Sequence, residues 1–117
     1  MFKFHHYAIE VTNPKVVCDF YKEMFGFVVE QKIDLEEEEL IFLKLGSFRL
    51  EVIRNEHAYL TTNNIHLCFQ TSNLQDTMKR FSEVGLRVEE GPYNLSNGWK
   101  TVFYKGLAGE VFEILEV

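Results

Sequence analysis

The 117-residue sequence predicts an α+β fold built from two copies of one unit, each a strand, a helix and three more strands. Both His6-Tyr-Ala-Ile-Glu-Val and His66-Leu-Cys-Phe-Gln-Thr have a strand-like composition, and each leads to an asparagine, a helical pattern and a glycine. Sliding one half on the other by 60 positions aligns His6 with His66 and Asn13 with Asn73. Self-similarity at a fixed offset indicates a duplicated structural unit.

In the first half, residues 4–11 read as a strand that stops at Thr12-Asn13-Pro14. Asparagine as N-cap with proline at the first helical position is a strong helix start. Apolar residues recur at helical spacing from Val16 to Phe25, and Gly26 is placed to end the helix. Three strands should follow, at about 26–33, 39–45 and 48–54, the last two joined as a hairpin by Gly46-Ser47.

The second half repeats this order. A strand over 65–71 leads to the N-cap Asn73, with Asp76 in the first turn, where the helix dipole favours an acid. The helix should run to Val84 and stop at Gly85. Strands are expected at about 86–90, 99–105 and 110–116, with turns at Gly91-Pro92, Asn97-Gly98 and Gly106–Gly109. We expect one domain over 1–117, with module 1 at about 1–56 and module 2 at about 64–117.

The composition narrows the functional class. The net charge of −6 and the pI near 5.2 argue against a nucleic-acid partner, which needs a basic face to meet phosphates. No apolar stretch approaches the roughly 18 residues of a membrane span, and the first residues do not resemble a secretory signal. Cys18 and Cys68 show no C-x-x-C spacing, so we expect reduced, half-buried thiols and a cytoplasmic protein.

Strand alternation suggests where the two leading histidines point. His6 shares a strand face with Ala8, and His66 shares one with Cys68, while the opposite faces are more apolar. The apolar faces should pack beneath the helices, which turns both histidines to the other side of the sheet. His5 competes with His6, but alternation points His5 toward the helix-packed side or the edge.

Each histidine has a matching glutamate near the end of its copy. Glu51 lies 45 residues after His6, and Glu113 lies 47 after His66. A carboxylate among apolar strand residues is costly unless its charge is compensated. A lone strand histidine is usually structural, but four candidates in equivalent places favour one metal bound by His6, Glu51, His66 and Glu113. These ligands suit zinc, nickel, iron or manganese.

These features resemble the vicinal oxygen chelate superfamily, which includes glyoxalase I, extradiol dioxygenases, methylmalonyl-CoA epimerase, and the fosfomycin resistance and bleomycin-binding proteins. The resemblance implies two βαβββ modules forming a curled mixed sheet around a metal site, with His6, Glu51, His66 and Glu113 at the family's ligand positions. One departure is Gly106-Leu107-Ala108-Gly109, where the family usually has Asp-Pro-Asp-Gly. The matching motifs are His6-Tyr-Ala-Ile-Glu-Val, Phe20-Tyr21, Phe25-Gly26-Phe27, Leu50-Glu51, His66-Leu-Cys-Phe and Gly109-Glu-Val-Phe-Glu113-Ile.

The resemblance implies a metal-dependent lyase or isomerase of glyoxalase I type. It would chelate adjacent oxygens of a small α-oxo or hydroxycarbonyl substrate at a divalent ion, nickel or zinc before manganese or iron, with Glu51 or Glu113 as the general base. The family likeness also implies a homodimer, whose site lies within one chain or between two. The alternatives are another reaction of the superfamily (ring-opening dioxygenation, epimerisation or thiol transfer to fosfomycin) and metal-free drug or metabolite binding.

The sequence leaves two possible roles open for a few other side chains. Arg49 shares a strand face with Glu51 and either neutralises an anionic substrate or forms a cross-strand ion pair. Trp99, Phe103 and Tyr104 either line the pocket or pack in the core.

Overall fold

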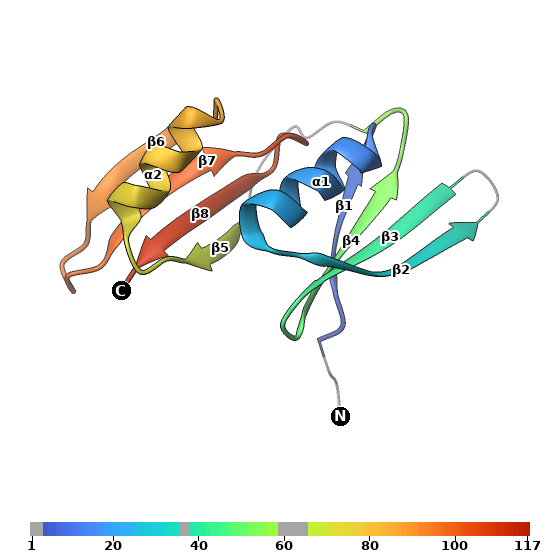
Figure 1. The fold of residues 1–117 in the computed structure, drawn as a ribbon, viewed down its shortest axis with the longest axis horizontal. Coiled ribbons are helices and arrows are strands. Elements are labelled where there is room, and N and C mark those ends of the chain that lie inside the picture. Colours follow the sequence, from blue (N-terminus) through green and yellow to red (C-terminus); the bar gives the residue numbers. More distant parts are fainter. Residues whose placement is uncertain (1–3, 36–37, 59–65) are drawn as a thin grey trace. The chain divides into compact units, whose positions relative to one another are not determined.

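The computed structural model describes residues 4–35, 38–58 and 66–117. The chain divides into two compact units, Met1–Tyr59 and Leu60–Val117, and each contains one helix and one four-stranded mixed sheet (Figure 1). The predicted α+β class and the duplicated βαβββ unit are confirmed.

In unit 1 the strand order is β1-β4-β3-β2, with β1 parallel to β4 and the other neighbours antiparallel. The helix α1 packs on β4 and β3, on one face of the sheet. The other face is therefore free of the unit's own helix. The elements are β1 (Tyr7–Val11), α1 (Pro14–Phe25), β2 (Val28–Leu35), β3 (Glu38–Leu45) and β4 (Phe48–Arg54).

Unit 2 repeats this topology, with the strand order β5-β8-β7-β6 and a parallel β5–β8 pair. Its helix packs on β8. The elements are β5 (Leu67–Gln70), α2 (Leu74–Glu83), β6 (Val88–Asn94), β7 (Lys100–Lys105) and β8 (Val111–Glu116). No helix in the three described segments is long and apolar enough to cross a membrane.

Both helices begin where their caps predict. The side chain of Asn13 accepts a hydrogen bond from the backbone N–H of Val16 at 3.3 Å, and that of Asn73 accepts one from Asp76 at 3.0 Å. Each bond satisfies a backbone donor that the first helical turn leaves without a partner. Gly26 ends α1 with φ of 81°, a left-handed conformation that favours glycine.

Three predicted boundaries are wrong. The strands predicted at 4–11 and 65–71 begin later, at Tyr7 and Leu67, because a strand needs a paired backbone, which side-chain alternation does not reveal. Residue 65 lies outside the described residues. Gly91-Pro92 lies inside β6 instead of ending it, because β6 is an edge strand whose register shifts between Val88 and Glu90 and between Glu90 and Tyr93. Proline is tolerated at such edges and bulges.

Each unit has its own core between the helix and the sheet. In unit 1, Leu43, Leu50 and Val52 are fully buried. In unit 2, the ring of Phe81 on α2 lies 5.1 Å from that of Tyr104, centroid to centroid. Tyr104 is therefore a core residue, and the interpretation that it lines a pocket is wrong.

Candidate metal centre

Strand register places Glu51 on the face of the sheet opposite the helix. In β4 it pairs with Ala8 of β1 and Phe42 of β3, and its chain neighbours Leu50 and Val52 are buried in the core. Residues that pair across strands share a face, and chain neighbours point to opposite faces. Glu51 is thus held by a rigid sheet and turned away from the core.

His6 lies just before β1 and meets this glutamate. Its Nε2 is 3.2 Å from Oε1 of Glu51, and the two side chains are 34% and 11% exposed. The ring of Phe42 lies edge-on to His6, with centroids 5.3 Å apart. Nδ1 of His5 is 2.8 Å from Nδ1 of His6, and the Phe42 ring also lies beside His5. Of the two places expected for His5, the helix-packed side is therefore wrong, and the sheet edge at β1 is not contradicted. Residues 5 and 6 precede the strand, so alternation does not govern them.

Unit 2 builds the same arrangement. His66 lies just before β5, and its Nε2 is 3.0 Å from Oε1 of Glu113 in β8. Glu113 pairs with Cys68 of β5 and Phe103 of β7. The Phe103 ring lies edge-on to His66 at 5.5 Å, as Phe42 does to His6. The two predicted histidine–glutamate pairs therefore form, one in each unit.

Each pair fits half of a divalent metal site. Two donor atoms at about 2.0–2.1 Å from one ion lie about 2.8–3.4 Å apart for angles between a right angle and the tetrahedral angle. The nitrogen–oxygen separations of 3.2 and 3.0 Å are compatible with that range. Within neither unit do the described residues gather three or more His, Cys, Asp or Glu side chains as a metal-binding group. One unit thus supplies two donors, fewer than the four of a closed zinc site.

The two cysteines are free thiols among the described residues, one buried and one exposed, where both were expected to be half-buried. Burial raises the pKa of Cys18 to about 11. Partial burial of its sulfur does most to raise the pKa of Cys68, also to about 11, and the charge of Glu113 and a hydrogen bond to it add to the effect. Both thiols are therefore protonated at neutral pH and weakly reactive. The cytoplasmic location remains a prediction.

Arg49 forms a cross-strand ion pair, which was one of its two predicted roles. Its Nε donates to Oε1 of Glu30 on β2 at 2.8 Å, and Nζ of Lys44 lies 3.5 Å from the other oxygen. The hydrogen bond from Arg49 is the main cause that lowers the pKa of Glu30. Arg49 already has an anionic partner, so we do not assign it to a substrate.

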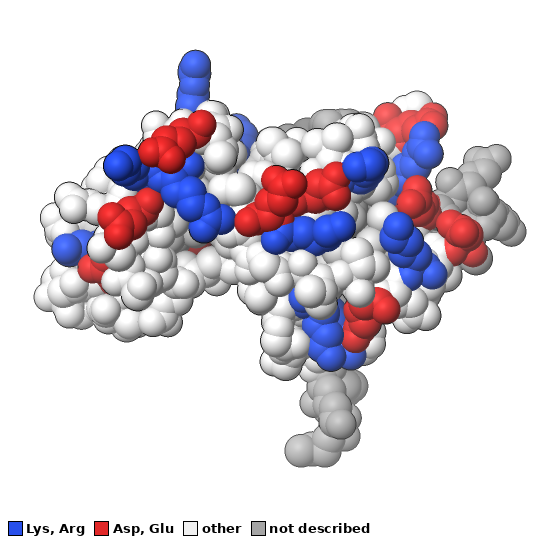
Figure 2. Space-filling model, in the orientation of Figure 1, with Lys and Arg blue, Asp and Glu red and all other residues white. Residues whose placement is uncertain are grey.

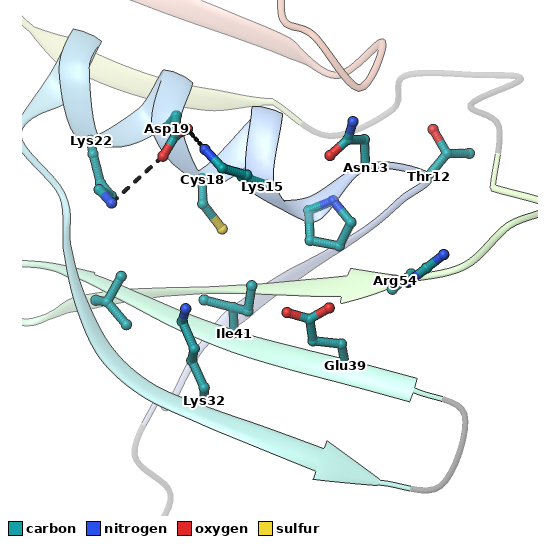
Figure 3. A pocket seen from close by; sticks show the side chains of 12 residues that line it. Thr12, Asn13, Lys15, Cys18, Asp19, Lys22, Lys32, Glu39, Ile41 and Arg54 are labelled. Carbon is teal, nitrogen blue, oxygen red and sulfur yellow. Dashed lines mark hydrogen bonds and ion pairs between the residues drawn. The ribbon is translucent and has the colours of Figure 1, made fainter.

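Each unit also has a hollow on its helix side. The one in unit 1, of about 600 Å³, lies between α1 and strands β2 and β3, with the Cys18 sulfur facing it (Figure 3). Ile41 lines it, and Phe42, the next residue, lies on the opposite face with His6. The hollow is thus separated from the His6–Glu51 pair by the sheet. On the surface shown in Figure 2, basic and acidic side chains lie intermixed.

Thr101 and Cys68 both contact Glu113, and neither was predicted to belong to the site. The Thr101 hydroxyl, on β7, donates to Oε2 of Glu113. A signal existed, because Thr101 is two residues before Phe103 and so shares its strand face. Trp99, by contrast, is 41% exposed and precedes β7.

Comparison with known proteins identifies the family. A search of curated proteins found no match. The solved structure of the glyoxalase family protein from Enterococcus faecalis is 26% identical, covers 97% of each chain and has a TM-score of 0.80. The trypanothione-dependent glyoxalase I of Leishmania major shares the fold at 21% identity, with 99% of this chain and 87% of that chain covered and a TM-score of 0.81.

A third structure of the same fold contains a metal. A mutant of the fosfomycin resistance protein FosX from Listeria monocytogenes, in complex with Mn(II) and 1S,2S-dihydroxypropylphosphonic acid, is 10% identical with a TM-score of 0.81, and 97% of this chain and 91% of that chain are covered. The model of the Glyoxalase/Bleomycin resistance protein/Dioxygenase superfamily matches residues 3–114. Nearly the whole chain is matched, and the chain therefore belongs to this superfamily.

Proposed function

We propose that the protein is a metal-dependent enzyme, a glyoxalase I-like lyase or isomerase that acts on a small α-oxo or hydroxycarbonyl compound. The observation that carries this proposal is the repeated pairing of a histidine nitrogen with a glutamate oxygen, His6 with Glu51 and His66 with Glu113. Both pairs lie at the same place in their modules, on the sheet face away from the helix.

We propose that these four side chains together bind one divalent ion. Two imidazole nitrogens and two carboxylate oxygens suit nickel or zinc, and also manganese or iron. The Mn(II) in the FosX complex, in a protein of the same fold, supports a divalent ion here. The contact between His6 and His5 supports it too, because a metal-binding histidine usually gives its other ring nitrogen to an outer partner.

A divalent ion bound there would supply Lewis-acid stabilisation of negative charge on substrate oxygens. The protein's own contribution is proton transfer by a glutamate. A carboxylate on the rigid sheet takes the proton from the carbon beside the carbonyl and returns it to the neighbouring carbon. The rings of Phe42 and Phe103 lie nearly perpendicular to the rings of His6 and His66, so each histidine has an apolar neighbour on this face.

The donor set weighs against the alternatives. A metal-free binding protein has no need for two glutamates held against histidines on an open sheet face. Ring-opening dioxygenases use two histidines and one carboxylate on iron, so a second carboxylate favours proton-transfer chemistry.

The decisive experiment is a substrate panel run with and without a chelator. The protein, purified without chelator and analysed for bound metals, is offered small α-hydroxycarbonyls and thiohemiacetals. We expect turnover of at least one compound, loss of turnover on chelation, and its return with Ni²⁺ or Zn²⁺. Absence of turnover, together with tight binding of an aromatic ligand at an affinity that the chelator does not change, would contradict the enzyme proposal and favour a binding protein.

We further propose a homodimer in which His6 and Glu51 of one chain share an ion with His66 and Glu113 of the partner subunit. One unit supplies two donors, and closed twofold symmetry completes two equal sites. Sedimentation should therefore show twice the chain mass of 13.8 kDa, and a clean 13.8 kDa species would count against the dimer.

Mixing two inactive variants separates the two site arrangements. A chain with His6→Ala and Glu51→Gln, mixed and refolded with a chain carrying His66→Ala and Glu113→Gln, forms dimers with one intact site if sites lie between chains. Metal binding and turnover should then partly return. A mixture that stays as inactive as its components would place each site within one chain.

A further inference from the structure

The outer strand of unit 2 turns Glu90 and Tyr93 to the same sheet face as Glu113. Glu90 pairs with Phe103 of β7, and Phe103 pairs in turn with Glu113 of β8. Tyr93 pairs with Thr101, whose hydroxyl donates to Glu113. Paired residues share a face, so both side chains lie on the helix-free face that carries the candidate metal centre.

The register shift at Gly91-Pro92 makes this arrangement possible. Residues three apart in a regular strand point to opposite faces, but the register of β6 shifts between Glu90 and Tyr93. The two side chains meet, since the Tyr93 hydroxyl donates to Oε1 of Glu90 at 2.9 Å. Gly91 has φ of 92°, and a Cβ there would lie 3.2 Å from the carbonyl oxygen of Thr101, so this position favours glycine. Bulges next to active sites often re-aim a side chain.

Glu90 differs from the neighbouring glutamate in its partners. Nζ of Lys105 lies 3.7 Å from Oε1 of Glu89. In the described part of unit 2, the Tyr93 hydroxyl is the one hydrogen-bonding or charged group in contact with the Glu90 carboxylate. That hydrogen bond raises the pKa of Tyr93, so the phenol stays protonated at neutral pH. The second carboxylate oxygen and the phenol oxygen therefore remain able to accept hydrogen bonds.

Aromatic surface continues this face toward the tip of the β6–β7 hairpin. The backbone N–H of Leu95 donates to the carbonyl oxygen of Trp99 at 2.8 Å, which extends the pairing one residue past Asn94. Leu95 and Trp99 therefore fall on the face of Tyr93. Both rings are accessible, with Tyr93 44% and Trp99 41% exposed. A carboxylate beside accessible aromatic rings suits an organic cation, which the negative charge and the ring faces both attract.

Unit 1 lacks this arrangement. At the matching positions of β2 and β3, Gln31 pairs with Phe42, and Ile33 pairs with Leu40. Neither Gln31 nor Ile33 carries a charge. The fold itself therefore does not require a carboxylate or a phenol at these places, and the pair in unit 2 needs another explanation.

We propose that Glu90, Tyr93 and Trp99 bind an ammonium group of the substrate, and that Glu90 sets this specificity. The inference rests on the proposed function, to which it adds the class of substrate. A primary ammonium has three N–H donors, which the carboxylate and the phenol oxygen can accept. Glu90 and Glu113 stand two strands apart, about 10 Å at the usual strand spacing. The substrate is thus an α-oxo or hydroxycarbonyl compound whose ammonium lies several bonds from its carbonyl.

Binding is tested without any turnover. The fluorescence of Trp99, the single tryptophan of the chain, is followed while the full, chelator-treated protein is titrated with butylammonium chloride or butanol at constant ionic strength. We expect saturable binding of the ammonium, weakened at least about tenfold in Glu90→Gln, the usual loss of a hydrogen bond to a charged group. Glu89→Gln removes the same charge one residue away and should bind as the wild-type protein does. Equal affinities for the two probes, or for the two variants, would overturn the proposal.

Two further measurements separate this role from others. Zn²⁺ affinity, measured by competition with a chelating dye, should be the same in Glu90→Gln and Glu89→Gln, and so should the mass found by sedimentation. A loss of Zn²⁺ affinity confined to Glu90→Gln would make Glu90 a metal ligand. Dissociation into single chains confined to that variant would make it a contact with the partner subunit. Either result would overturn the proposal.

Turnover tests specificity directly. The substrates are an α-hydroxyketone with a terminal ammonium and its analogue with a terminal hydroxyl. Glu90→Gln should lower the ratio of their kcat/KM values at least about tenfold, mainly by raising KM for the ammonium compound. An unchanged ratio would overturn the inference. Saturable ammonium binding by a wild-type protein that turns over neither compound would instead defeat the proposed function, so the two failures are distinguishable.

Discussion

Alanine in place of His6 or His66 should weaken Zn²⁺ binding more than about 100-fold. This exceeds the roughly 10–100-fold loss of affinity that usually follows when a residue that only hydrogen-bonds a metal ligand is removed. The reason is that each imidazole faces a glutamate oxygen at 3.2 or 3.0 Å and supplies one of the four proposed donors. A half-site with one remaining carboxylate cannot compensate. Dye competition on each purified variant measures the affinity, and turnover at a fixed zinc concentration should fall in parallel.

Two other histidines serve as matched controls. Nδ1 of His5 lies 2.8 Å from Nδ1 of His6, the ring nitrogen that does not face Glu51. His5→Ala should therefore lower Zn²⁺ affinity by no more than about 10–100-fold, the usual loss for a residue that hydrogen-bonds a metal ligand. His57 is exposed, and its backbone N–H bonds to Asn55, so His57→Ala should change nothing. Zinc affinity in the His6 or His66 variant equal to that of the His57 variant would refute the ligand assignment.

Alanine at Phe81 should cost about 3–5 kcal/mol of unfolding free energy, the usual loss for a fully buried phenylalanine. The Phe81 ring is 1% exposed and lies 5.1 Å from the ring of Tyr104 and 6.1 Å from that of Phe112. Its removal leaves a cavity among rings that the sheet holds in place. Since small domains are stable by about 5–15 kcal/mol, the loss is a large share of the total.

Urea unfolding followed by circular dichroism measures this loss. Leu107→Ala is the control, because Leu107 is an equally apolar residue in a turn and 52% exposed, where substitutions change stability by about 0.5 kcal/mol or less. A Phe81 variant that unfolds at the same urea concentration as the Leu107 variant would show that the ring cluster is not the core of unit 2.

Local signals in the sequence determined the repeated architecture and the two halves of the candidate site. An asparagine cap and a closing glycine act within a few residues of the helix they bound, so Asn13 and Gly26 predict α1 directly. The period of two in a strand likewise predicts that Glu51 and Leu50 face opposite sides. Because the copies are equivalent, locating one histidine–glutamate pair locates the other.

What the tertiary structure decided depends on pairing between distant strands. Strand register brings Thr101 and Cys68 to Glu113. Alternation places Thr101 on the same strand face as Phe103, but it does not show that this face lies beside the strand that carries Glu113. Pairing also decides that β1 starts at Tyr7, so His5 lies before the strand and does not follow its alternation. It places β6 at the edge of its sheet, where Pro92 is tolerated within the strand. Residues far apart in the chain meet because backbone hydrogen bonds between strands fix their register, and side-chain periodicity contains no record of which strand is the neighbour.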